Sequence, residues 1–401
     1  LDGTIRRTRG TLNAALFAQI TGYRGLVTSL NIGDLQRYCS NIELYCYPSL
    51  LMLYKSLSGR ELMGNYRSTS VATNPVNTIN QNYEINIDDI IGQDTVKKML
   101  AVSLAGGHHL LMIGSPGVGK TLLALSIKSL MPKLNTDESL EVARIYSLVE
   151  NSITDNPFLL YPPFRNPHHS TTYIGMIGGG TNPTPGEITL AHLGILFMDE
   201  FCEFPRQVIE VLRQPLESGF ISLTRAKYKV QFPAKFTLLA ATNPCKCGYK
   251  GDDTHKCTCT ERDIRNYFGR LSGPIIDRID LVTRVTKVSD LLNNVADKRK
   301  GITADTLRTY IDTARDIQKS RKFAGYLYNR DIPFHTIQSG VFLNRALILL
   351  LQKAADTYNL SGRACHKIIK VARTLADMEG ADTIGESHLL ESIQFKCEGT
   401  F

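Results

Sequence analysis

The chain has 401 residues, of which 43% are hydrophobic and 21% charged, a composition typical of a globular protein with two or three domains. Its 46 basic and 38 acidic residues leave a net charge of +8, a mild excess that permits binding to a polyanion without requiring it. No apolar run reaches membrane-spanning length, and the longest, Ala346–Leu351, is interrupted within a few residues. No secretory signal pattern opens the chain, so we expect a cytoplasmic protein with no membrane contact.

The composition changes along the chain and predicts three domains. Residues 1–70 mix short apolar runs with Gly, Tyr and Ser and predict a small mixed domain, and 71–82 lie in a polar, nearly uncharged stretch that predicts a linker. In 83–290, short apolar strands alternate with helical patterns, which predicts an α/β core with a parallel sheet. The last part, 291–401, is predicted to be helical. Its amphipathic patterns cover Ala304–Lys319, Leu343–Thr357 and Ala364–Glu379.

The strongest motif is a strand, a Gly-rich loop and a helix in direct succession. The apolar run His109–Ile113 leads into a G-x-x-x-x-G-K-T loop, and a helical pattern follows over Leu122–Leu130. Glycines allow backbone N–H groups to surround phosphates, Lys120 reaches the β- and γ-phosphates, and the Thr121 hydroxyl ligates Mg²⁺. The sequence therefore predicts an ATP site. The loop residues assigned to it are Gly114, Ser115, Pro116, Gly117, Val118, Gly119, Lys120 and Thr121.

Two later strands end in polar residues that can reach this loop. Gly194–Met198 precedes Asp199 and Glu200, and Phe236–Ala241 precedes Asn243 by one residue. Ligands of open α/β sheets bind at the carboxyl ends of the strands, so these side chains are expected to share the ATP site. We predict that Asp199 holds Mg²⁺ together with Thr121 and that Glu200 polarises the attacking water. Asn243 is predicted to orient that water or to contact the γ-phosphate.

These motifs resemble those of a known family. The chain is similar to the ComM/YifB family of magnesium-chelatase-like AAA+ ATPases of bacteria in the segments GSPGVGKTLLA, PGEITLAHLGILFMDE, LLAATNPCKCGY, RLSGPIIDRIDL and LSGRACHKIIKVARTLADMEG. The resemblance implies an α/β fold: a P-loop AAA+ αβα core, a C-terminal helical lid and a partial Lon-protease-like α+β N-terminal domain. The opening stretch LDGTIRRTRGTLNAAL resembles the later part of that domain, and the first residue is Leu, so we expect an N-terminally incomplete chain.

The resemblance also implies two arginines with catalytic roles and a homo-oligomeric ring, a hexamer. Arg278 lies where an arginine finger is expected, a residue that crosses the subunit interface and stabilises charge on the neighbour's γ-phosphate. Without the resemblance, a surface salt bridge is the simpler interpretation of Arg278. Arg363 matches the sensor-2 arginine, and Arg373 is the fallback for that role.

Two further segments bear on what such a motor would bind. Pro163–Gly180 resembles a pore-facing insert in which His168 and His169 would contact DNA phosphates, the alternative being a surface loop without a partner. Gly219–Lys235 predicts two short strands, Ile221–Leu223 and Val230–Phe232, and resembles the pre-sensor-1 hairpin of ring helicases. Basic residues near its turn suit a nucleic-acid backbone, although a solvated hairpin edge is the alternative. The basic residues assigned to DNA binding are Arg225, Lys227 and Lys229.

Four of the nine cysteines crowd into one Gly- and Asp-rich loop. Cys245 and Cys247 form one pair with a single residue between them, and Cys257 and Cys259 form another. Clustered thiols in a cytosolic chain favour metal over disulfides, and four thiolates can close a tetrahedral structural Zn²⁺ site. The one-residue gap strains chelation by both members of a pair, and His255 could replace one thiolate. A loop of free or oxidisable thiols is the alternative.

Two enzymatic hypotheses follow. The first is an ATP-hydrolysing ring motor on single-stranded or branched DNA, which by resemblance would act as a helicase that drives branch migration of recombination intermediates. The second is a chelatase-type ATPase that remodels a protein partner for metal insertion. The ATPase motifs do not separate the two, but the basic hairpin and the positive charge favour DNA. A non-enzymatic nucleotide-binding module would not need Lys120, Asp199, Glu200, Asn243 and Arg278 together.

Overall fold

The structure is a computed structural model in which two compact units are distinguished. It describes residues 2–6, 8–29, 39, 42–59, 85–149, 160–225, 228–287, 301–321, 328–333, 335–336 and 343–397, except the side chains of Arg225 and Tyr228. The first unit takes its described residues from Leu1–Asn82, Lys133–Tyr161 and Gly178–Pro185, and the second from Tyr83–Pro132, Pro162–Ile177 and Gly186–Phe401. The predicted linker 71–82 and the predicted boundary after 290 lie outside the described residues.

The second unit is built on a five-stranded parallel sheet with the strand order β11-β3-β10-β7-β4. The strands predicted before the Gly-rich loop, before Asp199 and before Asn243 are confirmed as its three central strands. Because every pair is parallel, the carboxyl ends of all five meet at one edge. The strands are β3 (Leu110–Ile113), β4 (Phe164–Arg165), β7 (Ile195–Met198), β10 (Thr237–Thr242) and β11 (Leu281–Arg284).

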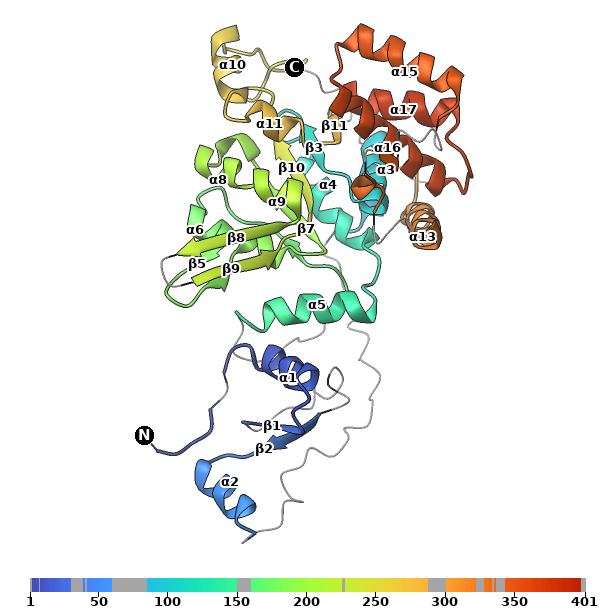
Figure 1. Cartoon of the computed structure of the whole chain (residues 1–401). Helices are drawn as coiled ribbons and strands as arrows, with labels where there is room; N and C mark the ends of the chain where they lie inside the picture. Colours follow the sequence, from blue (N-terminus) through green and yellow to red (C-terminus); the bar gives the residue numbers. More distant parts are fainter. Residues whose placement is uncertain are drawn as a thin grey trace. The chain divides into compact units, whose positions relative to one another are not determined.

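The sheet is covered on both faces, which confirms the αβα core. Along β3, Leu110 and Met112 belong to one apolar cluster, whereas Leu111 and Ile113 belong to another, as the two-residue period of a strand requires. Figure 1 shows α3 and α16 on one side of the strands and α8 and α9 on the other. Helices with residues in the first cluster include α3 (Asp94–Gly106), α4 (Lys120–Ser126), η4 (Ile127–Leu130) and α13 (Ala304–Arg321). Those with residues in the second include α6 (Tyr173–Ile177), α8 (Arg206–Val211), α10 (Glu261–Phe268) and α11 (Gly273–Ile276).

The part of the chain after the sheet is helical, as predicted. The described elements there are α13, η6 (Asn329–Asp331), α15 (Arg345–Tyr358), α16 (Gly362–Met378) and α17 (Glu386–Cys397). Helix α16 begins where the sequence indicated, because the Ser361 hydroxyl accepts a hydrogen bond from the Ala364 N–H at 3.2 Å and caps the first turn. Helices α15, α16 and α17 share their own apolar cluster, and α16 also contributes Val371, Leu375 and Met378 to the core beside the sheet.

A β-hairpin precedes the strand that leads to Asn243, which confirms the two strands expected in Gly219–Lys235. Strands β8 (Phe220–Arg225) and β9 (Tyr228–Pro233) pair in antiparallel register from Phe220 opposite Pro233 to Arg225 opposite Tyr228. The hairpin follows α9 (Arg213–Ser218) and is joined to β10 by three residues (Figure 1). The remaining short elements of this unit are η3 (Ile87–Asp89), α7 (Glu187–Leu190) and η5 (Phe201–Glu203).

The segment Pro163–Gly180 differs in part from the insert that was expected. Its first residues form β4, an edge strand of the central sheet, with Phe164 paired to Ile195. Its later residues form α6, whose Met176 is fully buried in the core beside β7. The segment is therefore partly core rather than entirely a mobile loop, because its apolar residues are needed to cover the end of the sheet.

In its described residues, the first unit contains a two-stranded parallel sheet and three helices. Helix α1 and strands β1 and β2 share a small apolar cluster with Ala143 of α5. The Asn13 amide also donates a hydrogen bond to the Arg144 carbonyl at 2.9 Å. The described elements are α1 (Thr11–Ile20), β1 (Gly25–Thr28), β2 (Glu43–Cys46), α2 (Leu50–Leu57) and α5 (Thr136–Tyr146), with the short antiparallel pair β5 (Gly178–Gly179) and β6 (Thr184–Pro185). No helix within the described ranges is both long and apolar enough to cross a membrane.

A buried carboxylate links the helical region to the sheet. Asp280, 4% exposed, accepts a hydrogen bond from the His109 N–H at 2.8 Å and lies 2.8 Å from the Lys367 ammonium of α16. Burial acts to raise the pKa of Asp280, but the charge and hydrogen bond of Lys367, together with other nearby groups, lower it by more. The pKa therefore lies well below its ordinary value. The carboxylate is therefore charged in the folded chain and fixes α16 to the start of β3.

We predict that Asp280→Ala lowers the free energy of unfolding of this unit by about 3–5 kcal/mol, because it leaves Lys367 without its buried partner. The measurement is the urea midpoint. The matched control is Asp305→Ala, which removes an exposed partner of Arg308 and is expected to change the midpoint little. Since the folded pKa of Asp280 is depressed, the difference between the two variants should be present above about pH 4 and shrink as pH falls. Equal midpoints at neutral pH would contradict this assignment.

Candidate nucleotide site

The Gly-rich loop joins the end of β3 to the start of α4. Gly117 and Gly119 have φ values of 80° and 91°, a left-handed conformation that side chains rarely adopt. Gly119 is the N-cap of α4, and its carbonyl accepts the first helical hydrogen bond from the Leu123 N–H at 2.9 Å. The positive end of the helix dipole therefore lies at the loop, where it favours an anion. The predicted strand, loop and helix are all present, and the helix begins at Lys120 rather than at Leu122.

Lys120 connects the loop to the neighbouring strand. Its ammonium group donates to the Gly114 carbonyl at 2.6 Å, to the Ser115 carbonyl at 2.9 Å and to the Asn243 Oδ1 at 3.1 Å. The residue is 9% exposed, and burial lowers its pKa, whereas the charges of Asp199 and Glu200 act in the opposite direction. Asn243 thus lies beside the lysine because β10 is the parallel neighbour of β3.

Two oxygen ligands meet at the end of β7. The Thr121 hydroxyl donates a hydrogen bond to the Asp199 Oδ2 at 2.7 Å, and the Asp199 Oδ1 accepts from the Glu200 N–H at 2.9 Å. Hydroxyl and carboxylate oxygens are the ligands that Mg²⁺ prefers, and Mg²⁺ usually takes only one or two carboxylates together with substrate phosphates. Thr121 and Asp199 therefore fit the predicted metal role.

Glu200 has an unusual backbone and an unexpected partner. Its φ of 51° is left-handed, which is uncommon for a residue with a side chain, and such strain concentrates at functional sites. The His169 Nδ1 lies 3.1 Å from the Glu200 Oε2, with the two side chains 40% and 53% exposed. The His168 ring lies against the His169 ring at 4.0 Å between centroids, and its Nδ1 lies 2.8 Å from the Ser170 hydroxyl. A residue expected at DNA therefore contacts the predicted catalytic glutamate.

Comparison with known proteins agrees with this geometry. Residues 86–291 match the family model of magnesium chelatase, subunit ChlI, and residues 301–396 match that of its C-terminal part. The chain is 38% identical over 401 residues to competence protein ComM of Haemophilus influenzae, with 99% of this chain and 76% of that protein covered. It is 35% identical over 398 residues to protein YifB of Salmonella typhimurium, with the same shares covered.

The chain belongs to the ComM/YifB family of magnesium-chelatase-like AAA+ ATPases. It is accordingly an AAA+ ATPase that uses ATP and Mg²⁺. A weaker similarity, 30% identity over 176 residues, relates 38% of the chain to Lon protease 2 of Bacillus subtilis. The family and its fold are those expected from the sequence motifs.

The arginine that the family resemblance assigns as a finger is held within its own chain. Arg278 donates to the Pro274 carbonyl at 2.6 Å and forms an ion pair with Glu217 at the end of α9. Its side chain is 12% exposed, and its Nε has no hydrogen-bond partner among the described residues. A role toward a neighbouring subunit would require Arg278 to exchange Glu217 for a phosphate.

The two candidates for the sensor-2 arginine differ sharply in environment. Arg363 is exposed in the first turn of α16 and makes no hydrogen bond or ion pair within the described part of the chain. Arg373 is 2% exposed and donates to the Asp377 Oδ1 at 2.9 Å and to the Asp382 carbonyl at 2.9 Å. Arg373 is fully engaged in the interior, and Arg363 stays the predicted sensor-2 residue.

Two of the basic residues proposed for DNA binding, Arg225 and Lys229, belong to the strands of the hairpin. Lys229 is exposed on β9, opposite Thr224 of β8. Lys227 and the side chain of Arg225 lie outside the described residues. The assignment of these three residues, and of His168 and His169, to DNA therefore stays a prediction.

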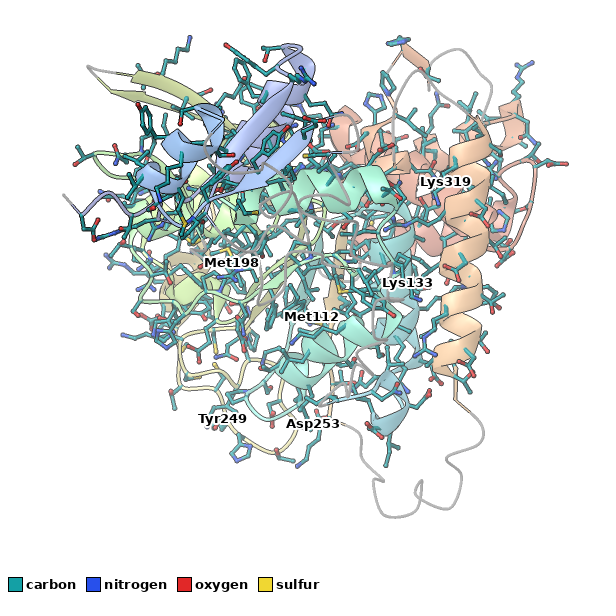
Figure 2. The ribbon with its side chains drawn as sticks, turned by 90° about the horizontal axis from the view of Figure 1, so that it is seen from below. Met112, Lys133, Met198, Tyr249, Asp253 and Lys319 are labelled. Atoms are coloured by element: carbon teal, nitrogen blue, oxygen red, sulfur yellow. The ribbon has the colours of Figure 1, made fainter. Side chains whose placement is uncertain are left out.

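The cysteine pairs lie together directly after Asn243. The sulfur atoms of Cys245, Cys247, Cys257 and Cys259 are all within 4.8 Å of one another. Figure 2 shows Tyr249 and Asp253 of this loop at the margin of the unit, whereas Met112 and Met198 of the sheet lie inside it. The loop and the nucleotide site thus share the carboxyl end of β10.

Sequence reasoning missed the contact of His169 with Glu200. The signal that could have found it is the order of strands, since β4 is the parallel neighbour of β7 and His169 follows β4 by four residues. It also missed Glu217 as the partner of Arg278, for which the sequence carries no signal because the pair is 61 residues apart.

We predict that His169→Ala lowers the ATPase turnover several-fold with little change in KM, because a Glu200 carboxylate without this partner is less well oriented toward water. The measurement is steady-state ATPase over a range of pH. The matched control is His168→Ala, which removes the adjacent ring and keeps the Glu200 contact. Equal turnover in the two variants would show that His169 has no positioning role.

Proposed function

We propose that this AAA+ ATPase is a hexameric ring motor that acts on single-stranded or branched DNA, as a helicase that drives branch migration of recombination intermediates. The observation that carries the proposal is the basic hairpin β8–β9 immediately ahead of the strand that leads to Asn243. The relative from Haemophilus influenzae is named a competence protein, and this name supports a function that involves DNA.

The proposed catalytic roles follow from the positions at the sheet edge. Lys120 contacts the β- and γ-phosphates of ATP, Thr121 and Asp199 hold Mg²⁺, and Glu200 polarises the attacking water. Asn243 lies close enough to Lys120 to report whether a γ-phosphate is present, since the two groups hydrogen-bond at 3.1 Å. Mg²⁺ would supply neutralisation of phosphate charge, which these side chains cannot supply alone.

The base of the hairpin supports coupling between DNA and ATP. The Ala234 N–H donates to the Gly219 carbonyl at 2.8 Å, which closes the hairpin. The carbonyl of the next residue, Lys235, accepts from the Leu193 N–H at 2.7 Å, two residues before β7 begins at Ile195. A displacement of the hairpin by bound DNA would therefore move the starts of both β7 and β10.

The ring requires residues that act between subunits. Arg278 is proposed to act on the neighbour's γ-phosphate after it leaves Glu217, and Arg363 to act as sensor 2 at the start of α16. The exposure of Arg363 and the unpartnered Nε of Arg278 among the described residues support these roles.

A chelatase-type activity is the second candidate. The match of 86–291 and 301–396 to magnesium chelatase subunit models favours it. In that case the ring would remodel a protein partner for metal insertion, and DNA would have no effect on turnover.

The first test compares the ATPase rate without DNA and with single-stranded DNA, duplex DNA or a four-way junction. We expect clear stimulation, strongest with single-stranded or branched DNA, because bound DNA would displace the hairpin that adjoins the catalytic strands. The matched variant is Glu200→Gln, which should bind ATP normally and lose turnover under every condition. Turnover that persists in Glu200→Gln would refute its catalytic role. A robust basal rate indifferent to all three DNAs would favour the chelatase-type function.

The second test addresses the hairpin. We predict that Lys227→Ala combined with Lys229→Ala weakens DNA binding and flattens its dependence on salt. Each lost phosphate contact should reduce the slope of log affinity against log salt concentration by about one. DNA-free ATPase should stay near normal. DNA affinity is measured at several salt concentrations. The control variant is Lys319→Ala with Lys353→Ala, two exposed lysines on other helices, which should leave the slope unchanged. Identical slopes in both pairs would contradict the assignment of DNA binding to the hairpin.

A further inference from the structure

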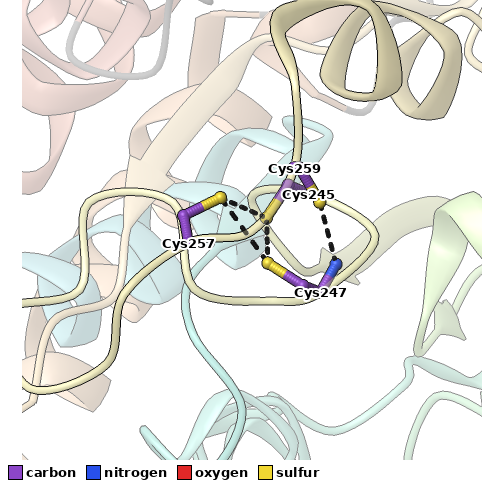
Figure 3. Close-up of side chains that lie close together, drawn as sticks. All are labelled: Cys245, Cys247, Cys257 and Cys259. Carbon is purple, nitrogen blue, oxygen red and sulfur yellow. Dashed lines mark hydrogen bonds between the residues drawn. The ribbon is translucent and has the colours of Figure 1, made fainter.

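The loop after Asn243 contains no helix or strand over residues 243–260, yet it brings four thiols to one point. We call residues 245–259 the cysteine loop. The Cys245 sulfur lies 3.3 Å from the Cys247 sulfur and 3.7 Å from the Cys257 sulfur, and Cys247 and Cys257 are separated by 3.5 Å (Figure 3). Both members of each pair therefore reach the same centre despite the one-residue gap.

These separations fit a single metal ion better than disulfides. A disulfide requires sulfur atoms about 2.05 Å apart. With Zn²⁺–S distances of about 2.3 Å, four sulfurs at the corners of a tetrahedron lie about 3.8 Å apart. The sulfur separations of 3.3, 3.5 and 3.7 Å are nearer the second value. A cluster of several iron atoms would hold the thiolates farther apart, because the cluster itself occupies the centre.

Backbone N–H groups around the sulfurs complete the pattern. The Cys247 N–H donates to the Cys259 sulfur at 3.4 Å. The Cys247 sulfur accepts from the N–H groups of Tyr249 and Thr258, and the Cys257 sulfur accepts from the Cys259 N–H. Such charge-assisted hydrogen bonds stabilise thiolates and orient metal ligands. His255 is not a ligand in this arrangement, since its ring stacks on Tyr249 at 4.7 Å and lies outside the group of four.

The cysteine loop also supports the phosphate-binding loop. Gly248 is buried with a φ of 88°, and a Cβ atom at this position would lie 2.7 Å from the Pro116 Cγ and 4.0 Å from the Asn243 Cγ. The Asp252 carboxylate accepts a hydrogen bond from the Ser115 hydroxyl as well as from Thr254. The loop therefore packs on Pro116 and bonds to Ser115, two residues of the Gly-rich loop.

We propose that Cys245, Cys247, Cys257 and Cys259 bind Zn²⁺ in a closed structural site, and that this site holds the cysteine loop against the phosphate-binding loop and thereby sets nucleotide affinity. All four coordination positions are filled by thiolates, so the ion has no open position for chemistry. The metal would act together with the Asp252–Ser115 hydrogen bond to hold Gly248 on Pro116, in a loop that has no helix or strand of its own. The proposal does not depend on action on DNA, because metal content and nucleotide affinity are measured without it.

The first experiment measures zinc in the purified chain and in the variants Cys247→Ser and Cys257→Ser. We expect one Zn²⁺ per chain, lost in both variants and kept in Cys365→Ser, whose thiol lies in the helical region away from the cluster. Reduced, metal-free protein titrated with Co²⁺ should show the visible absorption of a tetrahedral thiolate site. Absence of both zinc and this absorption, or recovery of the four thiols as disulfides, would overturn the metal site.

The second experiment separates the metal from its support of the nucleotide site. Gly248→Ala places a methyl group against Pro116 and is expected to keep zinc but to weaken binding of a fluorescent ATP analogue about ten-fold. Gly251→Ala is the matched control, since Gly251 has a similar φ of 77° and nothing within 4 Å of its Cβ position. It should keep both zinc and affinity. Equal nucleotide affinity in the two variants would overturn the supporting role, whatever the metal content.

Discussion

The hydrogen bonds of the Lys120 ammonium are the interaction on which the nucleotide site depends. Burying an ammonium is costly unless acceptors surround it, and here two loop carbonyls and Asn243 provide them. Those acceptors meet only because β3 and β10 are parallel neighbours whose carboxyl ends lie level. With β7 on the other side of β10, the same register places Asp199 beside Thr121. One sheet edge therefore assembles the whole site.

The helical region is tied to this sheet by buried charges rather than by apolar packing alone. Lys367 of α16 forms an ion pair with Asp280, which directly precedes β11. Lys367 lies one turn after Arg363, which is at the exposed beginning of the same helix. Farther along α16, Asp377 is fully buried and accepts hydrogen bonds from Asn329 and Arg373. Because Lys367 ties the beginning of α16 to Asp280, the first turn of the helix is held in a defined place, as the proposed nucleotide-sensing role of Arg363 requires.

The sequence predicted the elements that follow from local pattern, and missed those that depend on loop closure. The strands before Lys120, Asp199 and Asn243 were recognisable as short apolar runs bounded by motif residues, and α16 by its Ser361 cap. The contact of His169 with Glu200 was not, because it depends on which strand lies beside β7. Sulfur geometry in the cysteine loop was equally beyond reach, since spacing gives the number of possible ligands but not whether they converge.

Both proposals converge on the same stretch of chain around β10. The hairpin enters this strand at Thr237, and the cysteine loop leaves it after Asn243. If displacement of the hairpin is to change the position of Asn243, the loop at the far end of the strand must be rigid, because a flexible loop would absorb the movement. The proposed metal-bound loop, which packs on Pro116 through Gly248, would supply a rigid support at that end. The basic hairpin and the thiol cluster would then adjoin the two ends of β10, and a movement of the strand between them would reach the Asn243–Lys120 contact.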